Sequence, residues 1–189
     1  MIVCVYIPRF ALRAALAGQG GLAPGDLVAL APEAGREQVV GEVSPAAEGY
    51  GVAPGMRVGE AIARCPELRL IPPDPESARA LWSQALDRLE GLGAEVESDT
   101  AGIAYFEARG LHGLHGGSLE GVLAAARRAL GRPAPRLAAG PSRFCAYAAA
   151  RTTRARRGPR IVRPADAAAF LAPLPVALLR SRPELAWLP

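Results

Sequence analysis

The sequence contains no lysine, so all 22 of its permanently cationic side chains are arginines. With 18 acidic residues, the formal net charge is +4, and so mild a positive balance is weak evidence for nucleic-acid binding. No run approaches the roughly 18 uninterrupted apolar residues of a membrane helix. The N-terminus also lacks the basic region and small-residue cleavage site of a secretory signal. We therefore expect a cytoplasmic protein without a membrane partner.

Cysteine and histidine are scarce, which argues against a metal centre. Cys4, Cys65 and Cys145 are far apart and lie in apolar stretches, as buried reduced thiols do. His112 and His115 are separated by a glycine-containing loop, and no cysteine or carboxylate cluster adjoins them. We predict no disulfide, no metal site and no cofactor.

The bulk composition is that of a globular protein. Hydrophobic residues make up 50% of the 189 residues and charged residues 21%, enough for one core or two modest lobes. Aromatic residues make up only 5%, so no stacking platform for single-stranded nucleic acid is expected.

Apolar periodicity predicts alternating strands and helices. The predicted strands are 2–7, 94–97, 103–108 and 135–139, and the predicted helices are 9–17, 57–64, 75–92, 118–130 and 141–154. Between them, residues 22–70 are rich in glycine, proline and short apolar pairs, which favours a small lobe of short strands with one helix. The predicted elements follow the order of a ferredoxin-like sheet with an insertion after its first strand: strand, lobe, helix, hairpin, helix and strand. The predicted fold class is α+β.

Residues 96–107 are the most informative stretch. They read V-E-S-D-T-A-G-I-A-Y-F-E, which resembles, without a gap, the palm motif V-E-P-x-S-x-D-E-A-Y-x-D of Y-family DNA polymerases. In that family the adjacent Asp and Glu hold the divalent metals that activate the primer hydroxyl and the incoming triphosphate. Gly102 and Ile103 occupy those two positions here. Neither side chain offers the oxygen ligand that a hard cation requires.

Other segments extend the resemblance in the family's order. Residues 50–56, Y-G-V-A-P-G-M, resemble the fingers signature F-G-V-x-x-G-M, and residues 60–66 match the E-A-x-x-x-C-P that follows it. Residues 70–74 resemble the crossover back into the palm, and 140–144 resemble the start of the last palm helix. Residues 170–176 resemble the segment that leads toward the thumb.

The resemblance implies two domains. Residues 1–21 and 71–189 would form a palm-like domain, and residues 22–70 a fingers-like insertion. After Val176 the sequence contains no counterpart of the thumb hairpins, the little-finger domain or a clamp-binding tail. Binding to a sliding clamp is therefore not expected.

The family's other functional positions are also replaced. Active members end the first strand with D-x-D, and here Tyr6 stands at the first Asp, a metal ligand, and Pro8 at the second. A phenol is neutral at pH 7 and is a poor magnesium ligand. A Tyr and an Arg contact the triphosphate in active fingers, and Pro45 and Glu48 stand there in this sequence. A carboxylate repels a triphosphate, so the resemblance implies neither nucleotide binding nor catalysis.

Residues 4–10, C-V-Y-I-P-R-F, are similar to the ImuB-type members of the family, in which hydrophobic and Pro-Arg residues replace the acids. Those members are non-catalytic partners of a separate error-prone polymerase in mutagenic translesion synthesis. The resemblance implies a pseudoenzyme of DNA repair that acts in SOS mutagenesis at the bacterial nucleoid. Its expected partners are DNA and an error-prone DNA polymerase or another mutasome protein.

Positive charge is concentrated in residues 151–163, which we name the arginine stripe and which contain six arginines and no acid. These side chains can form charge-assisted bonds to phosphates, and Arg154 lies near the place where active members present a lysine to the triphosphate. A solvated helix end explains the stripe equally well. The residues predicted to contact DNA without sequence preference are Arg143, Arg151, Arg154, Arg156, Arg157 and Arg160.

Two alternative functions stay open. In an active nucleotidyl transferase with a rearranged metal site, Asp99 and Glu107 would supply the ligands. However, side chains alternate faces along a strand, and Asp99 lies three positions before Gly102, which argues against such a rescue. The other alternative is a protein-interaction module that no longer binds DNA.

Overall fold

The computed structural model describes residues 1–33, 35–131, 134–153, 158–175 and 178. The chain divides into two compact units. The first, the sheet unit, comprises Met1–Tyr6, Arg88–Asp99 and Ile103–Pro189, and the second, the smaller unit, comprises Ile7–Asp87 and Thr100–Gly102.

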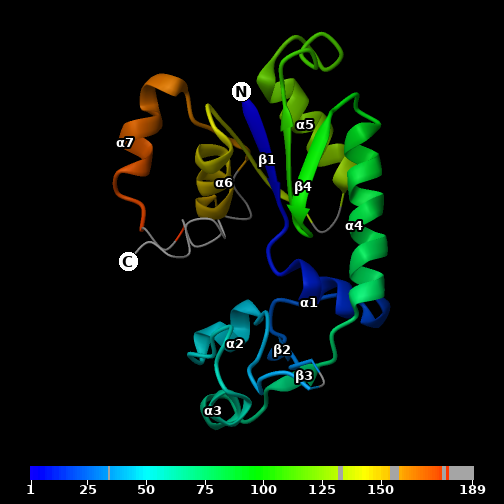
Figure 1. The fold of residues 1–189 in the computed structure, drawn as a ribbon, viewed down its shortest axis with the longest axis vertical. Coiled ribbons are helices and arrows are strands. Elements are labelled where there is room, and N and C mark those ends of the chain that lie inside the picture. Colours follow the sequence, from blue (N-terminus) through cyan, green and yellow to red (C-terminus); the bar gives the residue numbers. More distant parts are fainter. Residues whose placement is uncertain (34, 132–133, 154–157, 176–177, 179–189) are drawn as a thin grey trace. The chain divides into compact units, whose positions relative to one another are not determined.

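The sheet unit is built on a five-stranded sheet in the order β4-β5-β1-β6-β7 (Figure 1). Its central strand, β1, pairs antiparallel with both β5 and β6, while β7 extends the sheet in parallel to β6. A strand in this position needs apolar residues on both faces, and Val3, Cys4 and Val5 are all fully buried. The strands are β1 (Ile2–Tyr6), β4 (Val96–Thr100), β5 (Ile103–Glu107), β6 (Arg136–Gly140) and β7 (Arg160–Ile161).

Helices α5 (Leu119–Leu130) and α6 (Arg143–Thr152) cover the sheet, on opposite sides of β1 (Figure 1). Each begins at a serine whose hydroxyl accepts a backbone N–H from the first turn, Ser118 for α5 and Ser142 for α6. Helix α6 packs against β1 and β6 through a face rich in alanine, and the short helix α7 (Ala167–Leu171) packs against α6. The alanines allow α6 to approach the sheet closely.

The smaller unit has a separate core around a pair of parallel strands, β2 and β3. Ser44 organises this core because its buried hydroxyl caps α2 and donates to the Asp26 carbonyl oxygen over 2.6 Å. The elements are α1 (Phe10–Ala15), β2 (Val28–Leu30), α2 (Pro45–Gly49), α3 (Val58–Arg64), β3 (Arg69–Ile71) and the larger part of α4 (Pro75–Glu90). Short 3₁₀ helices form at Ala17–Gln19 and, in the sheet unit, at Pro164–Asp166.

The observed strand order confirms the predicted α+β class with a ferredoxin-like sheet. The prediction of one helix within residues 22–70 was wrong, because α2 forms there as well as α3. Helix α2 has only five residues and starts with Ser-Pro, a pair that resembles a turn when no periodicity follows. Strand β7 and helix α7 were not predicted. The division into domains at residues 22 and 70 stays a prediction.

The three cysteines are free and buried, as predicted. Burial raises the pKa of the Cys4 thiol to about 12, although a hydrogen bond with Tyr105 acts in the opposite direction. None of the helices in the described part of the chain is long and apolar enough to cross a membrane.

Candidate functional site

Strand β1 ends at Tyr6, and its partner across the ladder on β5 is Ile103. Both side chains are half-buried and pack against the apolar cluster beneath α6. The Tyr6 ring meets the Tyr147 ring edge-on, with centroids 6.1 Å apart and planes at 71°. At two of the positions where the resemblance places metal ligands, the side chain therefore packs against the hydrophobic core instead.

Gly102, the third such position, lies in the turn before β5 with a φ of +90°. Its carbonyl oxygen accepts a hydrogen bond from the Ile7 backbone N–H over 2.8 Å. A Cβ added at Gly102 would stand 2.7 Å from the Phe10 Cβ and 3.1 Å from the Ile7 carbonyl oxygen. These atoms lie on or next to the backbone and cannot swing aside as the end of a long side chain can. Any side chain here, a carboxylate included, is both strained and obstructed.

The acids proposed for a rearranged metal site do not replace these ligands. Glu107 lies opposite Ile2 in the ladder, whereas Ile103 lies opposite Tyr6. The two pairs are four positions apart along the strand, which is a distance of about 13 Å. Glu107 is instead 3.7 Å from Arg109. Within the described residues, no group of three or more His, Cys, Asp or Glu side chains could hold a metal ion, and the residues at the family's positions do not fit one.

Pro45 and Glu48, at the positions of the triphosphate contacts, both lie on α2. The Glu48 carboxylate accepts a hydrogen bond from the Arg9 guanidinium, whose Nε also donates to the Val43 carbonyl oxygen. The ion pair cancels much of the repulsion that an unpaired Glu48 would exert on a triphosphate, which corrects the electrostatic argument from the sequence. The prediction of weak nucleotide binding now rests on a different fact: neither Pro45 nor Glu48 offers a cation.

Arg9 adopts a left-handed backbone conformation, with φ 56° and ψ 46°, at the N-cap of α1. The arginine side chain has no hydrogen-bond acceptor, so α1 lacks a side-chain cap from its own N-cap residue. Glu42 supplies the missing acceptor, since its carboxylate accepts the Leu12 backbone N–H over 2.8 Å. Burial raises the pKa of Glu42, and the hydrogen bonds it accepts act against that rise.

Three of the arginines predicted to contact DNA are described, and each guanidinium lies over an aromatic ring. The Cζ of Arg143 lies 5.8 Å from the Tyr105 ring centre and that of Arg160 lies 4.5 Å from the Phe170 ring centre. Arg143 also pairs with Glu97. The remaining predicted contacts, Arg154, Arg156 and Arg157, lie outside the described residues.

The third arginine, Arg151, lies near the end of α6, with its Cζ 5.4 Å from the Tyr6 ring centre and 5.7 Å from that of Tyr147. A fourth, Arg136, comes to the same place and was missed in the sequence. Arg136 is the partner of Tyr6 on β6, and its Cζ lies 5.9 Å from the Tyr6 ring centre. The register of β1 against β6, which brings Arg136 here, is not readable from one sequence.

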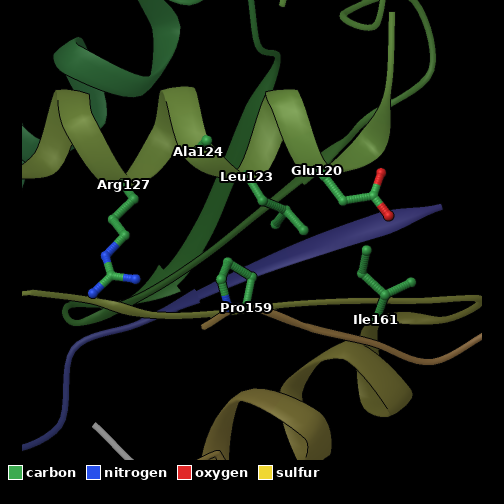
Figure 2. A pocket seen from close by; sticks show the side chains of 6 residues that line it. All are labelled: Glu120, Leu123, Ala124, Arg127, Pro159 and Ile161. Atoms are coloured by element: carbon green, nitrogen blue, oxygen red, sulfur yellow. The ribbon is translucent and has the colours of Figure 1, made fainter. Parts of the chain in front are cut away.

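A groove of about 170 Å³ lies between α5 and the segment that includes β7 (Figure 2). Figure 2 shows apolar side chains facing one another across it, with an acidic and a basic side chain at its two ends. Pockets for small molecules measure roughly 300–1,000 Å³, so this groove is too small for a nucleotide. Its lining residues are Glu120, Leu123, Ala124, Arg127, Pro159 and Ile161.

One histidine has a backbone partner: the Nε2 atom of His115 is 2.9 Å from the Leu92 carbonyl oxygen. The Nε2 atom of His112 is buried and has no partner among the described residues.

A family model described as IMS, impB/mucB/samB family, matches residues 5–155. The chain belongs to the impB/mucB/samB family. Among curated proteins, none matches the sequence significantly.

Solved structures of Y-family polymerases share the fold of this impB/mucB/samB member. The crystal structure of DinB from Sulfolobus solfataricus matches with a TM-score of 0.74 and 19% identity, over 98% of this chain and 57% of that one. A ternary complex of Dbh matches with a TM-score of 0.72 and 18% identity, over 94% of this chain and 52% of that one. A Y-family DNA polymerase chimera built on Dbh matches with a TM-score of 0.71 and 19% identity, over 94% and 53%.

The chain thus spans a little over half the length of each of these polymerases. The predicted resemblance to the Y-family palm and fingers region is confirmed at the level of family and fold.

Proposed function

We propose that this chain is a catalytically inactive Y-family module of the ImuB type, which serves translesion synthesis after DNA damage by binding DNA, an error-prone polymerase or both. The observation that carries the proposal is the replacement of the metal-ligand positions by Tyr6, Gly102 and Ile103. Gly102 weighs most, because its Cβ position is obstructed by Phe10 and the Ile7 carbonyl. The turn has lost the space for a carboxylate as well as the carboxylate itself.

The separation of the remaining acids supports this proposal over an active nucleotidyl transferase. Two-metal sites place their ions about 4 Å apart, so their ligands must converge. Glu107 lies at the opposite end of the β1–β5 ladder from Tyr6, and Asp99 is an exposed residue of β4. Primer extension with Mg²⁺ or Mn²⁺ tests the loss of catalysis, and the chain should add no nucleotide.

DNA binding is the second part of the proposal, and it is weak and insensitive to sequence. The arginine stripe offers up to six cations, of which about half can face one duplex, because successive residues point in different directions. About three neutralised phosphates give a slope of log affinity against log salt of roughly −3. Fluorescence anisotropy of a labelled duplex over a salt series measures this slope.

The decisive variant replaces Arg154, Arg156 and Arg157 with serine, which should flatten the slope and weaken binding to all sequences alike. A control with two charges removed replaces the exposed α4 arginines Arg79 and Arg88 with serine and should leave the slope unchanged. If the triple variant binds as tightly as the parent with the same slope, the stripe is a solvated face. A protein-interaction role then becomes the better function.

The proposed role places the protein in the bacterial cytoplasm, at the nucleoid, beside an error-prone polymerase or another mutasome protein. The family membership supports a DNA-related role. A sliding clamp is not among the proposed partners.

A further inference from the structure

We infer that Arg136 and Arg151, gathered at the Tyr6 ring, form a preorganised site for a phosphate group, which the DNA backbone supplies. The choice of DNA as the source rests on the proposed function. The phosphate chemistry itself rests on the arrangement of the two guanidinium groups.

The two arginines come from different elements and meet at the end of β1. Arg136 begins β6 and lies directly opposite Tyr6 in the antiparallel ladder, so both side chains emerge on the same face of the sheet. Arg151 reaches that face from the last turn of α6. Both Cζ atoms lie within 6 Å of the centre of the Tyr6 ring, at 5.9 Å and 5.4 Å. Two cations therefore share one aromatic surface.

Hydrogen bonds hold both guanidinium groups in place. Arg136 Nη1 donates to the Arg151 carbonyl oxygen over 3.1 Å, and Arg151 Nη1 donates to the Tyr147 hydroxyl over 3.1 Å. The rings of Tyr6 and Tyr147 in turn support each other edge-on. Side chains that are already ordered lose little rotamer entropy when a ligand binds, so this arrangement favours binding.

Neither cation has a carboxylate partner in the part of the chain that the structure describes. By contrast, Arg143 is paired with Glu97 and Arg9 with Glu48. The Nε of Arg136 is buried and has no acceptor among these residues. Each guanidinium carries five N–H donors, and the described residues accept only one bond from each.

Phosphate is the anion that suits this site best. Two like charges held near one ring repel each other, and an anion between them relieves that repulsion. Guanidinium forks match the spacing of phosphate oxygens and bind them in a bidentate manner. The positive charge of this site comes from the two arginine side chains and not from a metal ion. Tyr6, at the end of β1, stands where the family has a metal ligand. Binding should therefore need no divalent cation and should survive EDTA.

The test compares two double variants of the full chain by anisotropy with a labelled duplex in EDTA. Arg136→Gln with Arg151→Gln should weaken binding about tenfold or more and, because one phosphate contact is lost, reduce the magnitude of the salt slope by about 1. Arg127→Gln with Arg128→Gln removes the same charge from the exposed last turn of α5 and should leave the slope at the parent value. Circular dichroism verifies that each variant is folded.

A third variant keeps the test decisive if the glutamine pair does not fold. Arg136→Lys with Arg151→Lys retains both charges but loses the planar forks, so it should keep the parent's salt slope and still bind less tightly. If the parent binds duplex DNA and both site variants match the α5 control in affinity and slope, the inference is overturned while the proposed function stands.

A second experiment, with nucleotide in place of DNA, distinguishes the DNA backbone from a free nucleotide as the source of the phosphate. The same proteins are titrated calorimetrically with a deoxynucleoside triphosphate in EDTA. If the parent binds no duplex, the proposed DNA binding fails. Saturable nucleotide binding that the glutamine pair abolishes would then keep the phosphate site and assign it to free nucleotide. If the parent binds neither ligand, the site is overturned as well.

Discussion

Replacing Gly102 with alanine measures how firmly the turn before β5 excludes a side chain. The φ of +90° at Gly102 is a conformation that residues with a Cβ adopt at a cost of about 1–2 kcal/mol. The alanine Cβ would also meet the Phe10 Cβ at 2.7 Å and the Ile7 carbonyl oxygen at 3.1 Å. Phe10 cannot retreat freely, because its ring packs edge-on against Trp82 with centroids 5.1 Å apart.

Forcing an extra carbon into packed surroundings costs about 1–3 kcal/mol beyond the backbone cost. We therefore expect Gly102→Ala to lower the free energy of unfolding by about 2–5 kcal/mol. Urea denaturation with linear extrapolation measures this loss.

Gly20 supplies the matched control. It has a φ of +89° in the same unit, and a Cβ added there meets nothing within 4 Å. Gly20→Ala should cost the backbone term alone, about 1–2 kcal/mol. The difference between the two variants isolates the steric term. Equal losses of stability would refute the argument that the fold has closed this position to a side chain.

Three further outcomes are expected. Because burial raises the folded-state pKa of Glu42, its contribution to stability is complete below the unfolded-state pKa and is lost as pH rises through the folded-state pKa. Glu42→Gln should reduce the loss of stability with rising pH in a profile measured by chemical denaturation. An unchanged profile would contradict a raised pKa of Glu42. The Cys4 thiol, with its pKa raised to about 12, should resist iodoacetamide until urea unfolds the protein. Mass spectrometry measures the labelling, and labelling of Cys4 in the native state would contradict its burial. Calorimetric titration with a deoxynucleoside triphosphate and Mg²⁺ should give no saturable binding in the micromolar range at Pro45 and Glu48.

Long periodic segments made much of the fold predictable from the sequence. Helices α4 and α5 present apolar residues at helical spacing, and β1 is a continuous apolar run, so each has a local signature. Helix α2 and strand β7 have none, because the first is a single turn and the second is two residues long and is defined by its pairing with β6. Elements this short depend on tertiary contacts.

The candidate site divides in the same way. Gly102 and Ile103 were found because the motif of residues 96–107 aligns without a gap, and Tyr6 was found because it stands at the first Asp of the family's D-x-D. The Arg9–Glu48 pair joins residues 39 positions apart, and Arg136 reaches Tyr6 only through the β1–β6 register. Such contacts follow from the three-dimensional pairing of strands and loops, for which a single sequence has no signal.

Primer extension by the purified chain with Mg²⁺ or Mn²⁺ tests the proposed loss of catalysis most directly. The positions of Tyr6, Gly102 and Ile103 lead us to expect no template-directed incorporation of nucleotides with either metal. Incorporation that follows the template, and that Asp99→Ala or Glu107→Ala abolishes, would contradict the account and establish a rearranged metal site.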